Sequence, residues 1–279
     1  NHLSQTIMAV AEQKTSGTPA PDMVLWPENS TDIDPVLDFE SHQIVMGALA
    51  ISNRPILVGA VTDGPGKDER QTASMWWPPS SPQPTSTYHK RNLVPFGEWI
   101  PARSFFLPLI PVLGNIGRQS VPGTTPGVLD ATIAGQKVPV GVVVCFEVAH
   151  DGTVADTVRH GAKILVVQSN NSSFIDTAQT PQQWQITRAR AIETGRHIVV
   201  STTNSFSGLV NPDGSVAVRT NEGGHTHFTV TMPLESGLTM GVRIAPRLRV
   251  IILVIAAGAI AVSLLQRRRA MLAQANHNR

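Results

Sequence analysis

Runs of apolar, β-branched residues along the chain predict strands that are buried on both faces of a sheet. The longest such run covers residues 138–147 and carries Pro139 and Gly141 near its start. Segments with helical character separate several of these runs. Strands that alternate with helices, together with antiparallel hairpins, predict an α/β sheet protein with layered packing. The expected strands are 23–26, 56–62, 73–77, 131–134, 138–147, 164–168 and 198–202, with a hairpin over 209–218, and the expected helices are 3–13, 38–52, 153–160 and 181–194.

The hydrophobic pattern changes near the end of the chain. Residues 250–265 include no charged side chain and are followed by Arg267, Arg268 and Arg269. This run is a little shorter than the ~20 residues that usually span a bilayer, but flanking arginines that snorkel can make up the difference. A buried core helix is the alternative. We predict a transmembrane helix with basic flanks over 243–269 and a polar tail over 270–279; arginines at both ends leave its orientation open.

A second apolar segment, residues 105–116, is interrupted by Pro108, Pro111 and Gly114. These residues break helices, so the segment cannot form a regular spanning helix. We expect an exposed apolar loop that either packs on the domain or touches a membrane, and the sequence leaves both alternatives open.

Composition narrows the class of protein. Charged residues make up only 15 % of the chain against 41 % hydrophobic residues, which suggests a protein partly withdrawn from water. A net charge of +2 is too small to indicate a nucleic-acid partner. The single cysteine excludes an intramolecular disulfide and a cysteine-rich metal site. His225 and His227 share one face of a predicted strand, but no third ligand is near in sequence, so we expect no metal site and no cofactor.

Three residues with complementary chemistry, Glu28, Lys90 and Cys145, each follow or adjoin an extended segment. Taken alone, each has a structural explanation. Glu28 can be a helix cap or a turn residue, Lys90 a surface lysine and Cys145 a small core residue. Together they form a set, because a thiol needs a base to become a thiolate. A tetrahedral intermediate also needs donors near its oxyanion, which Lys90 and the N–H group of Phe146 can supply. The polar cluster 169–174 either lines a pocket or forms a plain turn.

Several motifs surround these residues, and together they resemble the nitrilase, or carbon–nitrogen hydrolase, superfamily with its Glu-Lys-Cys triad. More narrowly, the chain is similar to the apolipoprotein N-acyltransferase family. The motifs that carry the resemblance are Leu-Trp-Pro-Glu-Asn-Ser at 25–30, Tyr-His-Lys at 88–90, Leu-Val-Pro-Phe-Gly-Glu at 93–98, Cys-Phe-Glu at 145–147 and the segment 183–196.

The resemblance implies a nitrilase-like αββα sandwich over 1–242, followed by one C-terminal transmembrane helix. It also implies that Glu28 is the general base, Lys90 the oxyanion stabiliser and Cys145 the nucleophile. Many members carry a tyrosine where this chain has Phe146, which keeps the backbone donor but lacks a hydroxyl. The further acids that match the family's site, and that we expect to position Lys90 and the thiol, are Glu98 and Glu147.

The function implied is transfer of a fatty acyl chain from a membrane phospholipid, through a thioester on Cys145, to the N-terminal α-amine of diacylglyceryl-cysteine in a lipoprotein. The partners are then the phospholipid donor, the lipoprotein acceptor and the membrane. A membrane-anchored amidase that uses water, and a non-enzymatic anchored domain, are the rivals. The resemblance places the catalytic domain on the extracytoplasmic side of the cytoplasmic membrane. The family also has an N-terminal bundle of membrane helices and a first sheet strand, so we expect this chain to be a fragment of a multi-pass protein.

Overall fold

The computed structural model describes residues 1–277. It contains two units, one over Asn1–Leu238 and one that begins at Thr239, and each is considered by itself.

The first unit contains a five-stranded sheet in which β1 pairs with β2, β2 with β3 and β3 with β4, while β5 also pairs with β3. The β1–β2 and β3–β5 pairs are parallel and the other pairs are antiparallel. The predicted hairpin is confirmed, although its return strand starts at Glu69 because pairing continues as far as Asp63 and Arg70. No strand was expected at β4. The strands are β1 (Val24–Leu25), β2 (Ile56–Asp63), β3 (Glu69–Trp77), β4 (Ser86–His89) and β5 (Gln119–Ser120).

The second sheet has six strands in the order β11-β10-β9-β8-β7-β6. Its centre is parallel, because β7, β8 and β9 run in one direction, and β6, β10 and β11 pair antiparallel with their neighbours. The long apolar run that the sequence singled out is β7. The strands are β6 (Val128–Ile133), β7 (Gln136–Val144), β8 (Ile164–Asn170), β9 (Ile198–Thr203), β10 (Gly208–Val210) and β11 (Val216–Arg219).

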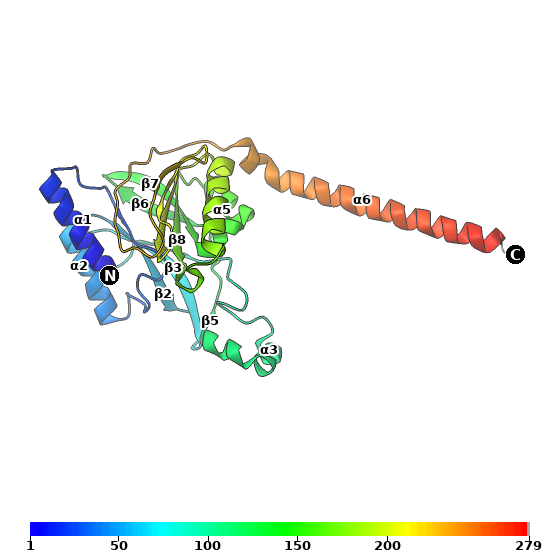
Figure 1. Cartoon of the computed structure of the whole chain (residues 1–279), viewed down its shortest axis with the longest axis horizontal. Coiled ribbons are helices and arrows are strands. Elements are labelled where there is room, and N and C mark those ends of the chain that lie inside the picture. Colours follow the sequence, from blue (N-terminus) through cyan, green and yellow to red (C-terminus); the bar gives the residue numbers. More distant parts are fainter. Residues whose placement is uncertain (278–279) are drawn as a thin grey trace. The chain divides into compact units, whose positions relative to one another are not determined.

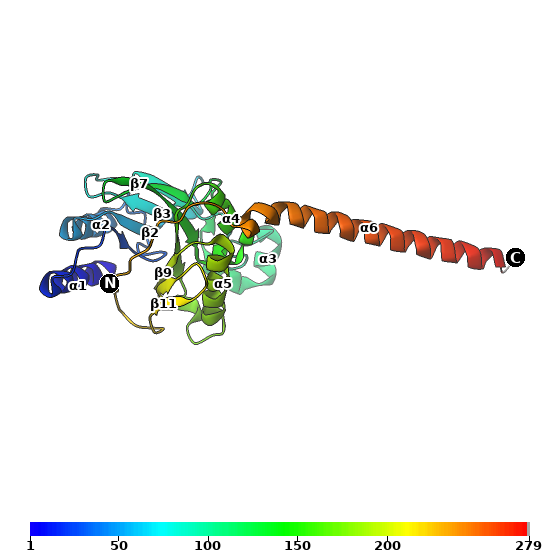
Figure 2. The ribbon, with the colours of Figure 1, turned by 90° about the horizontal axis from the view of Figure 1, so that it is seen from above.

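Helices cover the outer face of each sheet, as Figures 1 and 2 show. The first sheet is covered by α1 (His2–Ser16) and α2 (Phe39–Ser52), and the second by α4 (Asp151–Arg159) and α5 (Gln179–Thr194). Alternation along the strands separates three cores, because successive strand residues face opposite sides. Val142 and Val144 pack in the core between the sheets, whereas Val143 packs against α4 and α5. The predicted αββα architecture is therefore confirmed.

Strand direction brings several strand ends to one place. Because β1 is parallel to β2 and β4 lies two antiparallel steps from β2, β1 and β4 end at the same edge of the first sheet. In the second sheet the parallel strands β7 and β8 also end at a common edge. Carboxyl ends of such strands are where α/β proteins place their sites.

Two local expectations were wrong. The apolar segment forms a short helix, α3 (Arg103–Leu109), and a 3-10 turn, Pro111–Ile116. Pro108 lies inside α3 and removes one backbone donor from this seven-residue helix. None of the residues of α3 or the turn is buried, which favours the membrane alternative over packing on the domain. His225 and His227 lie in an irregular segment, not in a strand, and His227 contacts Gln5 and Glu12.

The second unit is built on α6 (Met240–His277), which continues into the segment predicted as a polar tail. Residues Val250–Arg268 have a mean hydropathy of 2.2 and no buried side chain. This helix alone, within the described residues, is long and apolar enough to cross a membrane by length and composition.

Candidate active site

Glu28 follows β1 in a tight turn and its side chain is almost fully buried. Its Oε1 accepts a hydrogen bond from Lys90 Nζ at 3.1 Å, and its Oε2 accepts one from the backbone N–H of Asn170 at 2.7 Å. The turn passes directly over β2 at Gly59, where a Cβ atom would lie 2.1 Å from the carbonyl oxygen of Pro27. Only glycine allows this approach, so Gly59 helps to place the carboxylate.

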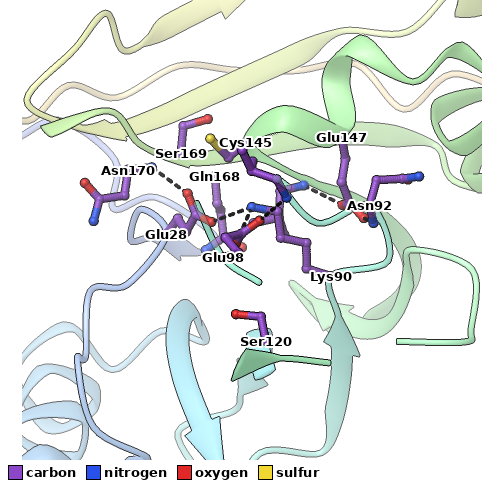
Figure 3. Close-up of polar contacts among 12 residues, drawn as sticks. Glu28, Lys90, Asn92, Glu98, Ser120, Cys145, Glu147, Gln168, Ser169 and Asn170 are labelled. Carbon is purple, nitrogen blue, oxygen red and sulfur yellow. Dashed lines mark hydrogen bonds and ion pairs between the residues drawn. The ribbon is translucent and has the colours of Figure 1, made fainter. Parts of the chain in front are cut away.

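Lys90 comes directly after β4 and is 2 % exposed. Its Nζ lies between two carboxylates, 3.1 Å from Glu28 Oε1 and 2.9 Å from Glu98 Oε1. Glu98 is itself held by the backbone N–H of Val94, which donates to its Oε2 at 2.7 Å. Glu98 therefore contacts Lys90 directly, and its role in positioning Lys90 stays a prediction. Figure 3 shows this cluster.

Burial and charge act together on these groups. Burial raises the pKa of Glu28, the ammonium of Lys90 opposes that rise, and Glu98 adds to it. For Lys90, burial by itself lowers the pKa, but the neighbouring Glu28, Cys145 and Glu98 outweigh burial, so that the pKa is raised. Lys90 is therefore a permanent cation, and Glu28 is a carboxylate that binds a proton more readily than an exposed one.

Cys145 stands where β7 ends, at the start of the 3-10 turn Cys145–Ala149. Its φ angle is +49°, a left-handed conformation that is uncommon for cysteine and that ends the strand three residues earlier than expected. Nothing in the sequence indicates this conformation, since the apolar run continues through Cys145 and Phe146. Because both residues lie in the first turn, their N–H groups have no acceptor within it.

Cys145 is a partly buried residue, and two amide side chains contact its thiol. It donates to Asn171 Oδ1 at 3.8 Å, and Gln183 Nε2 donates to its sulfur at 3.8 Å. Burial raises the pKa of the thiol to about 12, Glu28 adds to the rise, and Lys90 opposes it. The resting group is therefore a neutral thiol at pH 7, and it needs a base to react.

Glu147, the second acid after the cysteine, is completely buried and does not contact Lys90 Nζ or the thiol directly. One oxygen accepts hydrogen bonds from the Tyr88 hydroxyl at 2.7 Å and the backbone N–H groups of Arg91 at 2.7 Å and Asn92 at 3.1 Å. The other accepts from the N–H of Val144 at 2.8 Å. This carboxylate therefore joins the segment around Lys90 to the strand end that carries Cys145.

Phe146 is a large, half-exposed side chain beside the nucleophile and packs edge-on against the ring of His150. Its role in the predicted site depends on its backbone N–H and not on the ring.

The end of β8 supplies polar groups that the sequence only partly indicated. The cluster 169–174 had two explanations, and its first members line the site, because the backbone of Asn170 binds Glu28 and the side chain of Asn171 binds the thiol. The buried Gln168 joins the two sheets beneath, through Ser74 at 2.5 Å and the Trp26 carbonyl at 2.6 Å. Gln183 of α5 was not singled out as a site residue, because a polar residue on a helix usually faces water.

No metal site is evident in the part of the chain that the structure describes. Among residues 1–277, no group of three or more His, Cys, Asp or Glu side chains is arranged to hold a metal ion.

Comparison with known proteins identifies the family. The model of the Carbon-nitrogen hydrolase family matches residues 45–237. The chain belongs to the carbon–nitrogen hydrolase family. Solved structures with this fold include a Saccharomyces cerevisiae member of branch 10 of the nitrilase superfamily, with a TM-score of 0.58, 16 % identity and coverage of 80 % of this chain and 81 % of that one. An amidase from Nesterenkonia sp. has a TM-score of 0.55 and 16 % identity over 79 % of this chain and 80 % of that one. At such identity these likenesses show the fold alone.

Within the carbon–nitrogen hydrolase family, the resemblance to apolipoprotein N-acyltransferases is confirmed. The protein of that name from Mycolicibacterium smegmatis is 34 % identical over 275 residues, which are 96 % of this chain and 45 % of that protein. The one from Bdellovibrio bacteriovorus is 32 % identical over 209 residues, which are 71 % of this chain and 38 % of that protein. The chain thus spans less than half the length of these curated relatives.

Proposed function

We propose that this chain is the catalytic part of an N-acyltransferase. Cys145 would accept a fatty acyl chain from a membrane phospholipid and pass it to the α-amine of a diacylglyceryl-cysteine at the N-terminus of a lipoprotein. The observation that carries this proposal is the buried cluster in which Lys90 bridges Glu28 and Glu98 next to the single cysteine. The choice of acyl transfer to an amine, in place of hydrolysis, rests on the names of the relatives.

The first half of the reaction forms a thioester. Glu28 takes the proton from the Cys145 thiol, and the sulfur attacks the ester carbonyl carbon of the phospholipid. The resulting oxyanion accepts hydrogen bonds from the Lys90 ammonium and from the N–H of Phe146. When the ester C–O bond breaks, the leaving alkoxide takes the proton from Glu28, and lysophospholipid departs. The raised pKa of Glu28, caused mainly by burial, suits a group that must hold this proton in between.

The second half transfers the acyl chain. The acceptor amine attacks the thioester carbonyl carbon, and Glu28 takes a proton from its nitrogen. The C–S bond then breaks, an amide leaves, and the Cys145 thiolate recovers the proton from Glu28. A thioester is reactive enough to acylate an amine, so covalent catalysis divides a difficult exchange into two easier steps.

A membrane-anchored amidase is the second candidate, and the carbon–nitrogen hydrolase family match favours it. In that reaction an amide forms the acyl-enzyme and water replaces the lipoprotein amine. The exposed apolar side chains of α3 support the lipid substrate instead, because a soluble amide would not require them, whereas the apolar helix Val250–Arg268 fits either candidate.

We also propose, on the same support, that residues 1–242 form the catalytic domain and that α6 anchors it in the cytoplasmic membrane. The domain would face the extracytoplasmic side, where lipoprotein N-termini are exposed. Additional membrane helices and a first strand would come from the rest of a longer protein.

The test uses the complete protein in detergent with a phospholipid that carries an alkyne-tagged acyl chain. Intact mass and hydroxylamine-sensitive capture should show the label on Cys145, and a diacylglyceryl peptide should remove it. Cys145→Ala should take no label. A wild type that takes no label but hydrolyses small amides would establish the amidase, and a protein with neither activity would overturn both candidates.

A further inference from the structure

The sulfur of Cys145 has two amide neighbours that play no part in the mechanism above. Gln183 of α5 donates from Nε2 to the sulfur at 3.8 Å, and the same nitrogen donates to Ser169 Oγ at 3.0 Å. Asn171, at the end of β8, offers its Oδ1 to the thiol hydrogen. Both residues approach the sulfur from the second sheet and its helix, whereas Glu28, Lys90 and Glu98 belong to the first sheet and its connections.

The orientation of the Gln183 amide is coupled to that of the Asn171 amide. Its Oε1 accepts a hydrogen bond of 2.6 Å from Asn171 Nδ2, and Asn171 is almost fully buried. A flipped Gln183 amide would direct Nε2 at the Nδ2 donor of Asn171 and Oε1 at the sulfur, so that two favourable contacts would be lost. With Asn171 in this orientation, an N–H group of Gln183, and not its carbonyl oxygen, faces the sulfur.

A donor in this place affects the charged and neutral sulfur differently. Hydrogen bonds to a charged group are stronger than those to its neutral form, so a donor that faces Sγ favours the thiolate. In acyl transfer the sulfur carries negative charge twice, once as the attacking nucleophile and once as the leaving group. At both moments the Lys90 ammonium is shared between Glu28, Glu98 and the oxyanion. A further donor from the second sheet can therefore stabilise the negative charge on the sulfur.

We propose that Gln183 is a catalytic residue that stabilises the Cys145 thiolate through Nε2, and that Asn171 is the positioning residue that keeps this end of the amide on the sulfur. The proposal extends the site of the proposed function and rests on it. The charged groups that act on the sulfur are Glu28 and Glu98, which oppose the thiolate, and Lys90, which favours it. The buried Ser169 side chain also favours the thiolate, through a hydrogen bond to the sulfur.

The test measures the thiol itself and needs no lipid substrate. Complete protein in detergent is treated with iodoacetamide between pH 7 and 9, and the alkylation rate at Cys145 is followed by peptide mass spectrometry. Gln183→Met keeps the length of the side chain but removes the donor. It should reduce the thiolate fraction about tenfold, equivalent to one pKa unit. A more basic thiolate is intrinsically more nucleophilic, so alkylation should slow about threefold.

Gln183→Glu is the second variant, because its carboxylate can still accept from Asn171 Nδ2 and so preserves the packing. It places negative charge beside the sulfur, and its alkylation should be slower than that of Gln183→Met. Gln182→Met is the matched control, since the neighbouring Gln182 is exposed and the same change there should leave the rate unaltered. Alkylation of either Gln183 variant at the wild-type rate, or equal slowing by the Gln182 control, would overturn the proposal.

The role of Asn171 is tested by coupling. In an Asn171→Leu background the amide of Gln183 is free to turn, so Gln183→Met should slow alkylation less than it does in the wild type. Equal slowing in both backgrounds would show that Asn171 does not orient Gln183. If the variants change alkylation as expected but the wild type transfers no acyl chain, the proposed function is refuted, while the stabilisation of the Cys145 thiolate by Gln183 is not.

Discussion

The buried carboxylate of Glu147 offers the sharpest test of how the two halves of the site are joined. We consider Glu147→Gln, which keeps the shape of the side chain but replaces one acceptor oxygen by an NH₂ group. Glu147 accepts from four donors, with Tyr88, Arg91 and Asn92 on one oxygen and Val144 on the other. A glutamine retains most contacts when its oxygen faces the group of three, which leaves the N–H of Val144 opposite another donor.

The magnitude follows from these contacts. One buried donor without an acceptor costs about 1–3 kcal/mol, and three hydrogen bonds that change from charged to neutral acceptors lose roughly 2 kcal/mol together. We therefore expect the free energy of unfolding to fall by about 3–5 kcal/mol, a large part of the total stability of a typical domain. For a unit of this size that corresponds to a lowering of Tm by at least about 6 °C.

The assay is thermal unfolding of the purified protein in detergent, followed by circular dichroism. Glu40→Gln is the control, because Glu40 is exposed in the first turn of α2 and the same chemical change should cost about 0.3–1 kcal/mol there. Acyl transfer should decrease in the folded fraction of Glu147→Gln as well, because Lys90 and Cys145 lose their shared support. A Tm within about 2 °C of the control would refute the reasoning.

Two further predictions concern charge and surface. In Lys90→Met the pKa of Glu28 should rise further, because burial and Glu98 raise it and only the backbone N–H of Asn170 remains to lower it. A carboxyl with a raised folded-state pKa is stabilising below its unfolded pKa of about 4.3 and loses that contribution as pH rises. Denaturant unfolding should therefore show a loss of about 3–5 kcal/mol at pH 8 that shrinks at pH 5, and an equal loss at both values would contradict this account. Replacing the exposed Phe105 and Leu109 of α3 by Asn and Gln should leave Tm unchanged but slow acyl transfer from phospholipid vesicles by at least about tenfold, because each apolar side chain gains about 1.5–3 kcal/mol on leaving water and about 1.4 kcal/mol corresponds to a factor of ten. Unaltered transfer from vesicles would place α3 away from the lipid.

Elements with a clear hydrophobic pattern in their own residues could be predicted from the sequence. The run that became β7 is apolar at consecutive positions because both of its faces are covered, one by the other sheet and one by helices. The same is true of the hairpin at β2 and β3. The apolar helix Val250–Arg268 could also be predicted from the sequence, because the hydrophobicity and length of a segment depend only on its own residues. Motif resemblance, and not periodicity, singled out Glu28, Lys90 and Cys145.

Features that depend on contacts between distant residues could not be predicted in this way. Strand β4 has polar positions and no apolar run, and it is a strand because it pairs with β3 and its Tyr88 binds Glu147. The backbone N–H of Asn170 reaches Glu28 across 142 residues of sequence, and Gln183 reaches Cys145 across 38.

A sequence pattern therefore records how far each position is shielded from water and which chemical groups the chain carries. Which of those groups meet depends on strand order and direction, which are decided by the packing of the whole domain. Glu28, Lys90 and Cys145 became a cluster only because β1, β4 and β7 end at neighbouring edges of two facing sheets. The tertiary structure also decides the left-handed conformation of Cys145 and the contact of the Asn171 and Gln183 amides with its sulfur. Tertiary contacts, and not local preference, hold a cysteine at positive φ.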